Sequence, residues 1–208
     1  MKKEQQLENL RNECIKCKKC NLCLGRTNLV FGVGNPESEI MLIGEAPGEN
    51  EDLKGEPFVG RSGKLLDLML GEVDLSRKKN IYISNIVKCR PPENRVPSTS
   101  EQDNCINWLY RQIDIIQPNV IICLGRTSAA RIINPKIKIS KEHGRFFRKN
   151  FIISSDESNK NVLIMPMLHP AAILRNLNKK PEFIADLVHM KQYLQNSNKS
   201  GDNITLLN

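Results

Sequence analysis

The chain has 208 residues and a formal net charge of +8, because 31 Lys and Arg residues outnumber 23 Asp and Glu residues. This length suits one domain with a sizeable core and is short for two. The basic excess favours a polyanionic partner such as nucleic acid, although a lysine-rich proteome would produce the same charge. No apolar run reaches the roughly 20 residues of a membrane span, and the first residues do not form a signal peptide. We therefore expect a cytoplasmic protein with no membrane association.

Four of the seven cysteines follow one another at intervals of three residues: Cys14, Cys17, Cys20 and Cys23. Disulfides explain the cysteines poorly, because the cytoplasm is reducing and their number is odd. A metal site could use these four alone, or it could combine Cys17 and Cys20 with Cys89 and Cys105. Zn²⁺ and an iron–sulfur cluster both accept four thiolates, so the spacing leaves both open. Cys123 lies in an apolar run and is interpreted as a small buried hydrophobe.

Four apolar runs predict buried strands at residues 40–43, 81–87, 120–124 and 162–167. Helical patterns alternate with these runs, and the last helix begins at Pro181. The alternation predicts an α/β fold: a three-layer α/β/α sandwich with a central, mainly parallel four-stranded sheet and helices on both faces. Residues 146–154 could add a hairpin to the last strand. We expect a single domain over 1–195, with a cysteine-rich N-terminal segment, and a polar tail over 196–208.

Polar side chains occur where these predicted strands end. Glu45 follows the first strand and His169 follows the fourth, and ligand sites of open α/β sheets form at the carboxyl ends of strands. Asn85 would be costly inside a buried strand unless its amide caps a turn or reads a base edge. Phe58 is either a core residue or a ring for stacking. We expect Glu45, Asn85 and His169 to share one site.

Four segments together resemble the family 4 uracil-DNA glycosylases, the iron–sulfur branch of the uracil-DNA glycosylase superfamily. They are 44–52 (GEAPGENED), 55–60 (GEPFVG), 85–92 (NIVKCRPP) and 169–176 (HPAAILRN). Relatives that form a covalent adduct with DNA carry glutamine at the position of Ala46 and an inserted basic loop, so the hydrolytic branch matches better. The resemblance implies a DNA repair enzyme that hydrolyses the N-glycosidic bond of uracil in DNA and leaves an abasic site. We expect it to act as a monomer.

The resemblance also implies roles in a uracil pocket. Phe58 would stack on the base, while the Asn85 amide would donate to O4 and accept from N3–H. His169 would donate to O2, and Glu45 would position water or stabilise the sugar cation. Ala46 completes the matching pocket residues together with Glu51, which would lie near the base edge that carries the methyl group in thymine. The remaining acidic-segment residues are interpreted as a solvated rim: Glu49, Asn50 and Asp52.

On the DNA side, the resemblance implies that Ile173 or Leu174 wedges into the vacated base stack and that Arg175 meets the backbone or the widowed base. Arg61 would add positive charge for a phosphate. The family holds a four-iron, four-sulfur cluster, and the matching ligands are Cys17, Cys20, Cys89 and Cys105. Nothing in the sequence selects a sliding clamp or a polymerase as a protein partner.

Two other functions explain part of the pattern. A non-enzymatic protein could use a metal knot to hold a basic nucleic-acid-binding domain, which would account for the cysteines and the charge. A phosphohydrolase or nucleotidyl-transfer enzyme could hold Mg²⁺ on the acidic segment 44–52. Only the glycosylase needs no divalent metal, so activity in a chelator separates the three.

Overall fold

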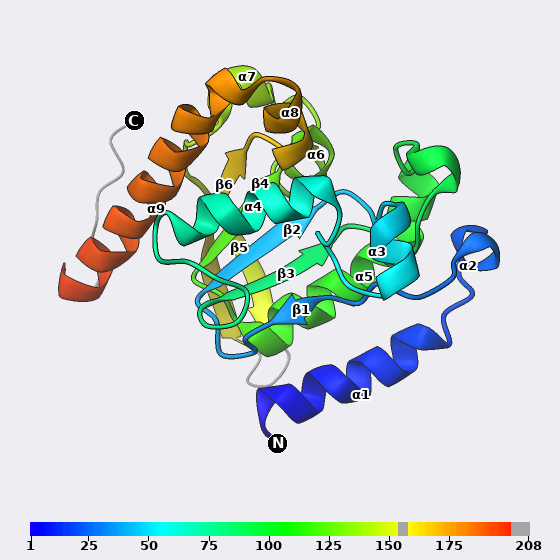
Figure 1. Cartoon of the computed structure of the whole chain (residues 1–208). Coiled ribbons are helices and arrows are strands. Elements are labelled where there is room, and N and C mark those ends of the chain that lie inside the picture. The colour runs from blue at the N-terminus through cyan, green and yellow to red at the C-terminus, as the bar shows by residue number, and fades with distance from the viewer. Residues whose placement is uncertain (154–157, 201–208) are drawn as a thin grey trace.

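A computed structural model of the chain describes residues 1–153 and 158–200. Within these residues one sheet has six strands in the order β1-β3-β2-β4-β6-β5 (Figure 1). Its four central strands are parallel, as expected, and an antiparallel strand extends each edge. The α/β class and the parallel centre are therefore confirmed, whereas the predicted number of four strands is too low. The strands are β1 (Val33–Gly34), β2 (Ile40–Gly44), β3 (Ile81–Asn85), β4 (Val120–Leu124), β5 (Phe147–Ile153) and β6 (Ser158–Met167).

Helices cover both faces of the sheet, because successive strand residues point to opposite faces. Met41 and Ile43 pack in one hydrophobic cluster with residues of α1, α5 and α6. Leu42 and Ile83 pack in a second cluster with residues of α4, α8 and α9, which gives the three layers seen in Figure 1. The helices named here are α1 (Lys3–Ile15), α4 (Arg61–Gly71), α5 (Thr99–Ile116), α6 (Arg126–Ile132), α8 (Pro170–Arg175) and α9 (Lys180–Ser200).

Short helices complete the described part of the chain. Helix α3 includes the second half of the acidic segment 44–52. It begins after Gly48 and ends at Lys54, and it is followed by Gly55, whose left-handed φ of 73° suits glycine. The short helices are α2 (Leu22–Gly25), α3 (Glu49–Lys54), η1 (Pro92–Asn94), α7 (Ile139–Glu142) and η2 (Leu177–Lys179).

Two element ends differ from the sequence prediction. Strand β3 ends at Asn85 rather than at residue 87, so Asn85 lies at the carboxyl edge of the sheet. Helix α9 continues to Ser200, past the expected domain boundary at 195, and the rest of the expected tail lies outside the described residues. The expected hairpin is confirmed by the antiparallel pairing of β5 with β6, although residues 154–157 of its turn also lie outside them. No helix in the ranges described has the length and apolar character to cross a membrane.

Candidate active site

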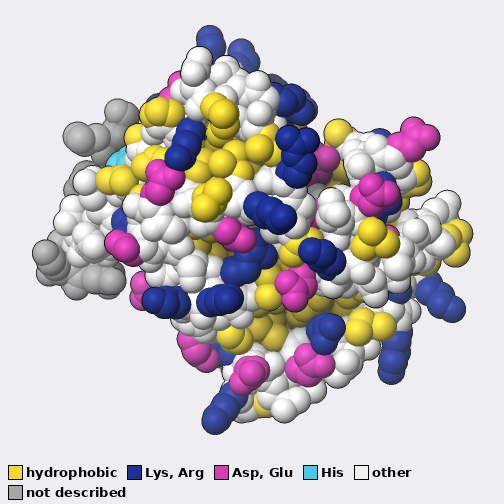
Figure 2. Space-filling view, in the orientation of Figure 1, with side chains coloured by type: hydrophobic (Ala, Val, Ile, Leu, Met, Phe, Trp, Pro, Cys, Tyr) yellow, Lys and Arg dark blue, Asp and Glu magenta, His cyan; other side chains and the backbone are white. Residues whose placement is uncertain are grey.

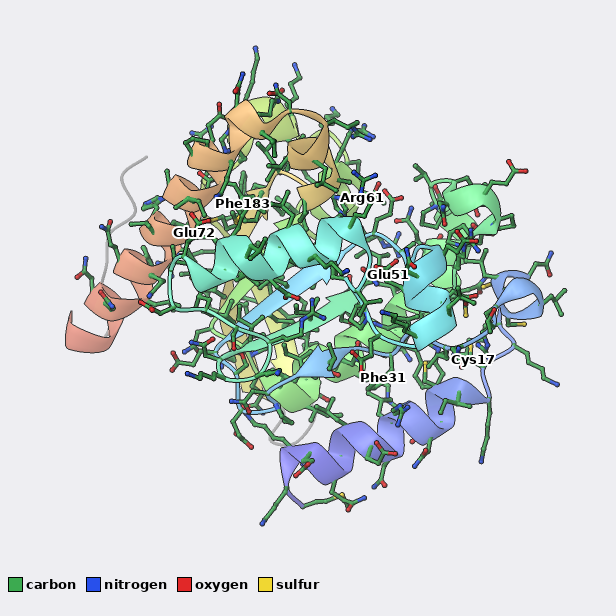
Figure 3. All side chains as sticks on the ribbon, viewed as in Figure 1. Cys17, Phe31, Glu51, Arg61, Glu72 and Phe183 are labelled. Atoms are coloured by element: carbon green, nitrogen blue, oxygen red, sulfur yellow. The ribbon has the colours of Figure 1, made fainter. Side chains whose placement is uncertain are left out.

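A cavity of about 570 Å³ opens at the carboxyl edge of the sheet, where the four parallel strands end. The strand register places Gly44 beside Asn85, while β4 and β6 lead into Gly125 and His169. Figure 3 labels Glu51 close to this edge, and Arg61 at the start of α4. The six residues expected to form a uracil pocket all line this cavity: Glu45, Ala46, Glu51, Phe58, Asn85 and His169.

Asn85 and Phe58 form a narrow slot in this cavity. The Asn85 side chain is 2% exposed, and within the described residues its Oδ1 atom has no hydrogen-bond partner. The Phe58 ring lies with its centroid 5.7 Å from that of His169. Burying an acceptor without a partner costs about 1–3 kcal/mol, so this oxygen is suited to a donor that arrives with a ligand.

Gly44 keeps the slot open, because a Cβ atom at this position would lie 2.3 Å from Asn85 Oδ1 and 2.7 Å from Phe58 Cζ. Gly44→Ala is therefore expected to displace both side chains and to weaken binding of free uracil at least about tenfold, the effect of roughly 1.4 kcal/mol. Gly71→Ala is the matched control, since a Cβ there meets no atom within 4 Å. Calorimetric titration measures the affinity of each variant for uracil. Equal affinities in the two variants would contradict the conclusion that Gly44 keeps the slot open.

His169 is held as a neutral hydrogen-bond donor. It caps α8, and its Nδ1 atom accepts the Ala171 amide over 3.1 Å. The proton of the neutral ring is therefore on Nε2. Burial first and the positive charge of Arg175 second lower the pKa of His169 to about 4, against a smaller opposing effect of Glu51. At neutral pH the ring can thus donate from Nε2 without carrying a charge.

Glu45 is oriented by a residue that the sequence reasoning missed. The Thr127 hydroxyl, on α6, donates to Glu45 Oε2, and Thr127 lines the cavity together with Arg126. Both follow Gly125 directly after β4. The signal that drew attention to Glu45 and His169, a polar residue just after a predicted strand, could have identified them.

The acidic side chains of α3 have structural partners. Glu51 accepts backbone amides from Gly48 (3.1 Å), Val59 (2.9 Å) and Gly60 (2.8 Å), which joins the starts of α3 and α4. Asp52 is only 2% exposed and accepts the amide of Thr27 over 3.0 Å. The expectation of a solvated rim is therefore wrong for Asp52, which ties the cysteine-rich segment to the cavity wall. Glu49 and Asn50 are exposed.

The residues expected to touch DNA differ in accessibility. Leu174 is 36% exposed and Arg175 lines the cavity, whereas Ile173 is 0% exposed within the core. Of the two candidate wedges, only Leu174 is therefore available in this structure. Arg61 is exposed at the first position of α4, beside the cavity rather than in its lining. Figure 2 shows basic side chains distributed among acidic ones over this side of the molecule.

A second cavity lies where the end of α1 and the α2 region approach α5 (Figure 3, near Cys17). The four expected ligands line it, and so do Cys14 and Cys23. They come from three parts of the chain: the N-terminal run, the segment after β3, and α5. Cys123 is fully buried in β4, as expected of a core residue. The lining residues are Cys14, Cys17, Lys19, Cys20, Cys23, Leu29, Lys88, Cys89, Asn104, Cys105 and Trp108.

The chemistry around these thiols fits an iron–sulfur cluster. The Lys88 amide donates to Cys105 Sγ and Arg26 donates to Cys89 Sγ, each over 3.3 Å, and such bonds stabilise thiolates. Trp108 Nε1 is buried, and no acceptor for it lies among the residues described. In the described part of the chain, no group of three or more His, Cys, Asp or Glu side chains is arranged to hold a single metal ion. Burial raises the pKa of Cys105 to about 11, so binding of a metal centre must displace protons.

Comparison with known proteins agrees with this geometry. Residues 31–191 match the family model described as the uracil DNA glycosylase superfamily. The chain belongs to that superfamily. It is 42% identical to a type-4 uracil-DNA glycosylase of Archaeoglobus fulgidus over 88% of this chain and 90% of the relative.

Two further relatives carry the same name. The protein of Sulfurisphaera tokodaii is 45% identical over 83% of this chain and 77% of its own length. That of Saccharolobus solfataricus is 40% identical over 95% of this chain and 90% of its own length. These similarities place the chain in the type-4 branch, as the four sequence segments predicted.

Proposed function

We propose that the chain is a monofunctional uracil-DNA glycosylase, which hydrolyses the bond between uracil and its deoxyribose and leaves an abasic site. The Oδ1 atom of Asn85 carries this proposal, because it is buried beside the Phe58 ring and finds no hydrogen-bond partner among the described residues. Membership of the superfamily and the names of the type-4 relatives support it. Free thiols and a DNA substrate suit the reducing cytoplasm.

The slot recognises uracil by its hydrogen-bonding edge. Asn85 Oδ1 accepts from uracil N3–H while Nδ2 donates to O4, and Phe58 stacks on the ring. Cytosine presents the opposite pattern at both atoms, because its N3 accepts and its N4 donates. A site that leaves its own polar groups unpaired against the wrong base can reject it by about 10⁴- to 10⁵-fold.

Departure of the base builds negative charge on uracil O2 and positive charge on the sugar. His169 Nε2–H donates to O2, and it stabilises the charge as it forms. Glu45, held by Thr127, faces the sugar and positions water or stabilises the cation. Among the described residues that line the cavity there is no lysine, which supports hydrolysis by water rather than an amine-linked intermediate.

DNA must present the base outside the helix, at a cost of a few kcal/mol that is lowest for a mispaired uracil. Leu174 would fill the vacated stack, because it is apolar, 36% exposed and directly precedes Arg175, which lines the cavity. Arg175, Arg126 and Arg61 supply positive charge around the opening, and such contacts to phosphate are independent of sequence.

A four-iron, four-sulfur cluster on Cys17, Cys20, Cys89 and Cys105 is part of the proposal. When bound, such a cluster supplies a covalent tie between the N-terminal segment and α5, and no hydrolytic step passes through it. The thiols, the two N–H···S contacts and the buried Trp108 Nε1 support this assignment.

Cys89→Ala is expected to lower the affinity for iron by more than about 100-fold, because even the outer partners of metal ligands contribute 10- to 100-fold. The variant protein should lose the brown colour of an iron–sulfur cluster, and its Tm should fall. Cys123→Ala removes a fully buried thiol from β4, away from the cysteine cavity, and should retain full iron. Iron analysis of these two variants, and of Cys14→Ala and Cys23→Ala, tests the ligand set. Loss of iron in Cys14→Ala but not in Cys89→Ala would assign the cluster to the N-terminal cysteine run instead.

Thr127→Val is expected to slow uracil release about 10- to 100-fold at unchanged KM, because a valine of the same shape cannot hold Glu45 and one hydrogen bond to a charged group contributes about 1.5–3 kcal/mol. Thr127→Ser retains the hydroxyl and should restore the rate. Steady-state kinetics of the two variants checks this. If serine fails to restore what valine removes, the hydroxyl does not position Glu45.

The decisive experiment measures free uracil released from a uracil-containing oligonucleotide in EDTA, by chromatography of the freed base. A glycosylase releases uracil under these conditions, and an otherwise identical cytosine oligonucleotide yields no free base. A Mg²⁺-dependent phosphohydrolase would be inactive in EDTA, and a binding module would shift the oligonucleotide on a gel without forming product. Either of these results would refute the proposal.

A further inference from the structure

Lys88 lines the cysteine cavity and also contacts Asn85, which lines the other cavity. Its side chain is 0% exposed, it follows Asn85 by three residues, and it directly precedes Cys89. The ammonium donates to Ser84 Oγ (2.5 Å), Gln112 Oε1 (2.7 Å) and the Asn85 carbonyl (2.9 Å). An ammonium has three N–H groups, so each has an acceptor and none is left over for a substrate.

The acceptors of Lys88 are themselves anchored. Gln112 lies on α5 and donates through Nε2 to the Phe31 carbonyl over 2.9 Å, and Ser84 Oγ lies 3.0 Å from the same oxygen. Cys105 occupies the same helix, and its sulfur accepts the Lys88 amide. Lys88 therefore contacts the cysteine cavity through its amide and the strand that carries Asn85 through its ammonium.

The charge of this ammonium requires compensation. Its three acceptors are neutral, and in the described part of the chain no Asp or Glu forms an ion pair with it. A buried charge without compensation is costly. The nearby groups that would carry negative charge as cluster ligands are Cys89 and Cys105, which line the same cavity as Lys88. Thiolates that hold a metal centre would provide this charge.

We propose that Lys88 is a positioning residue that joins the two sites. It is the buried counter-charge of the cysteine centre, and by holding the backbone carbonyl of Asn85 it orients the side-chain amide of Asn85 in the uracil slot. The positioning half rests on the proposed function. Lys88 is not a nucleophile, because its side chain is fully buried and its three N–H groups are engaged.

The experiment compares Lys88→Met with Lys149→Met. Lys149 is a half-buried lysine that also donates to a backbone carbonyl, that of Ile132 over 2.9 Å, but it lies on β5. Protein-film voltammetry without DNA measures the cluster potential. Lys88→Met should shift it to more negative values, because a nearby positive charge favours the reduced cluster. Uracil release at single turnover should fall about 100-fold, the effect of a small displacement of a group in the site. Lys149→Met should change neither.

Two further variants separate charge from position and serve if Lys88→Met does not fold. Lys88→Arg retains the charge and should keep the potential of the parent protein. Ser84→Ala retains Lys88 but removes an acceptor, so uracil release should slow while the potential stays constant. Unchanged potential in Lys88→Met, or unchanged release in both Lys88→Met and Ser84→Ala, would overturn the proposal. If the parent protein released no uracil, the proposed function would fail, whereas the potential shift would still test the counter-charge.

Discussion

His169→Ala is expected to lower the single-turnover rate of uracil release by about 10²- to 10³-fold, the usual loss when one donor to a developing oxyanion is removed. The affinity for uracil-containing DNA should change little, because phosphate contacts dominate binding. The Ala171 amide donates to the imidazole and so fixes the direction of its Nε2–H group. A water molecule that replaced the ring would have no such fixed direction for its hydrogen bond to O2. Rapid-quench kinetics and a binding assay on the same oligonucleotide measure both quantities.

The pH dependence adds an independent check on His169. Burial lowers its pKa to about 4, so the neutral ring predominates throughout the neutral range. Protonation would place a second N–H on Nδ1, facing the Ala171 amide, and would disturb the turn that orients the ring. The release rate should therefore be independent of His169 ionisation near neutrality and fall as the pH drops towards about 4. His169→Ala should lack this fall of the rate at acid pH. The control is His143→Ala, because the His143 ring does not line the cavity and its Nδ1 atom lies 2.7 Å from Asp186 Oδ2. This variant should keep both the release rate and its fall at acid pH. An acid limb centred near the ordinary histidine pKa would contradict the buried neutral ring.

The strands that frame the cavity were predictable because their apolar runs are long enough to carry a pattern. Strand β1 was not, since two residues have no period, and its position comes from pairing Val33 with Ile83. The end of β3 was also hidden. Ile86 and Val87 continue the apolar run, yet their amides turn to the carbonyls of Gly44 and Glu45 over 3.0 and 3.2 Å. That contact joins segments far apart in sequence, so no local pattern reveals it.

The site followed a similar division. Glu45 and His169 could be identified because ligand sites in this class of fold form at the carboxyl ends of strands, where both residues were predicted to lie. The burial of Asp52 and of Lys88 could not be predicted, because a charged residue is expected to be solvated until its buried partners are known. Ile173 and Leu174 are neighbours on α8, and only packing against the core decides that the first is buried and the second exposed.

Asn85→Ala is expected to remove most of the preference for uracil over cytosine, which the amide can supply at about 10⁴- to 10⁵-fold, and to slow uracil release by two or more orders of magnitude. The same change should cost the free protein little stability. Alanine leaves a small cavity, but it also removes an acceptor whose lack of a partner costs about 1–3 kcal/mol.

Activity and stability should thus separate at Asn85, which a purely structural role would not allow. Competition between uracil and cytosine oligonucleotides measures the preference, and thermal unfolding without DNA measures the stability. Asn107→Ala, at an exposed asparagine of α5, is the control for both and should match the parent protein. A large fall in Tm with the preference intact would mean that Asn85 supports the sheet edge and does not read the base. A lost preference at nearly constant Tm would mean that the buried Oδ1 is kept unpaired for the substrate at the expense of the fold.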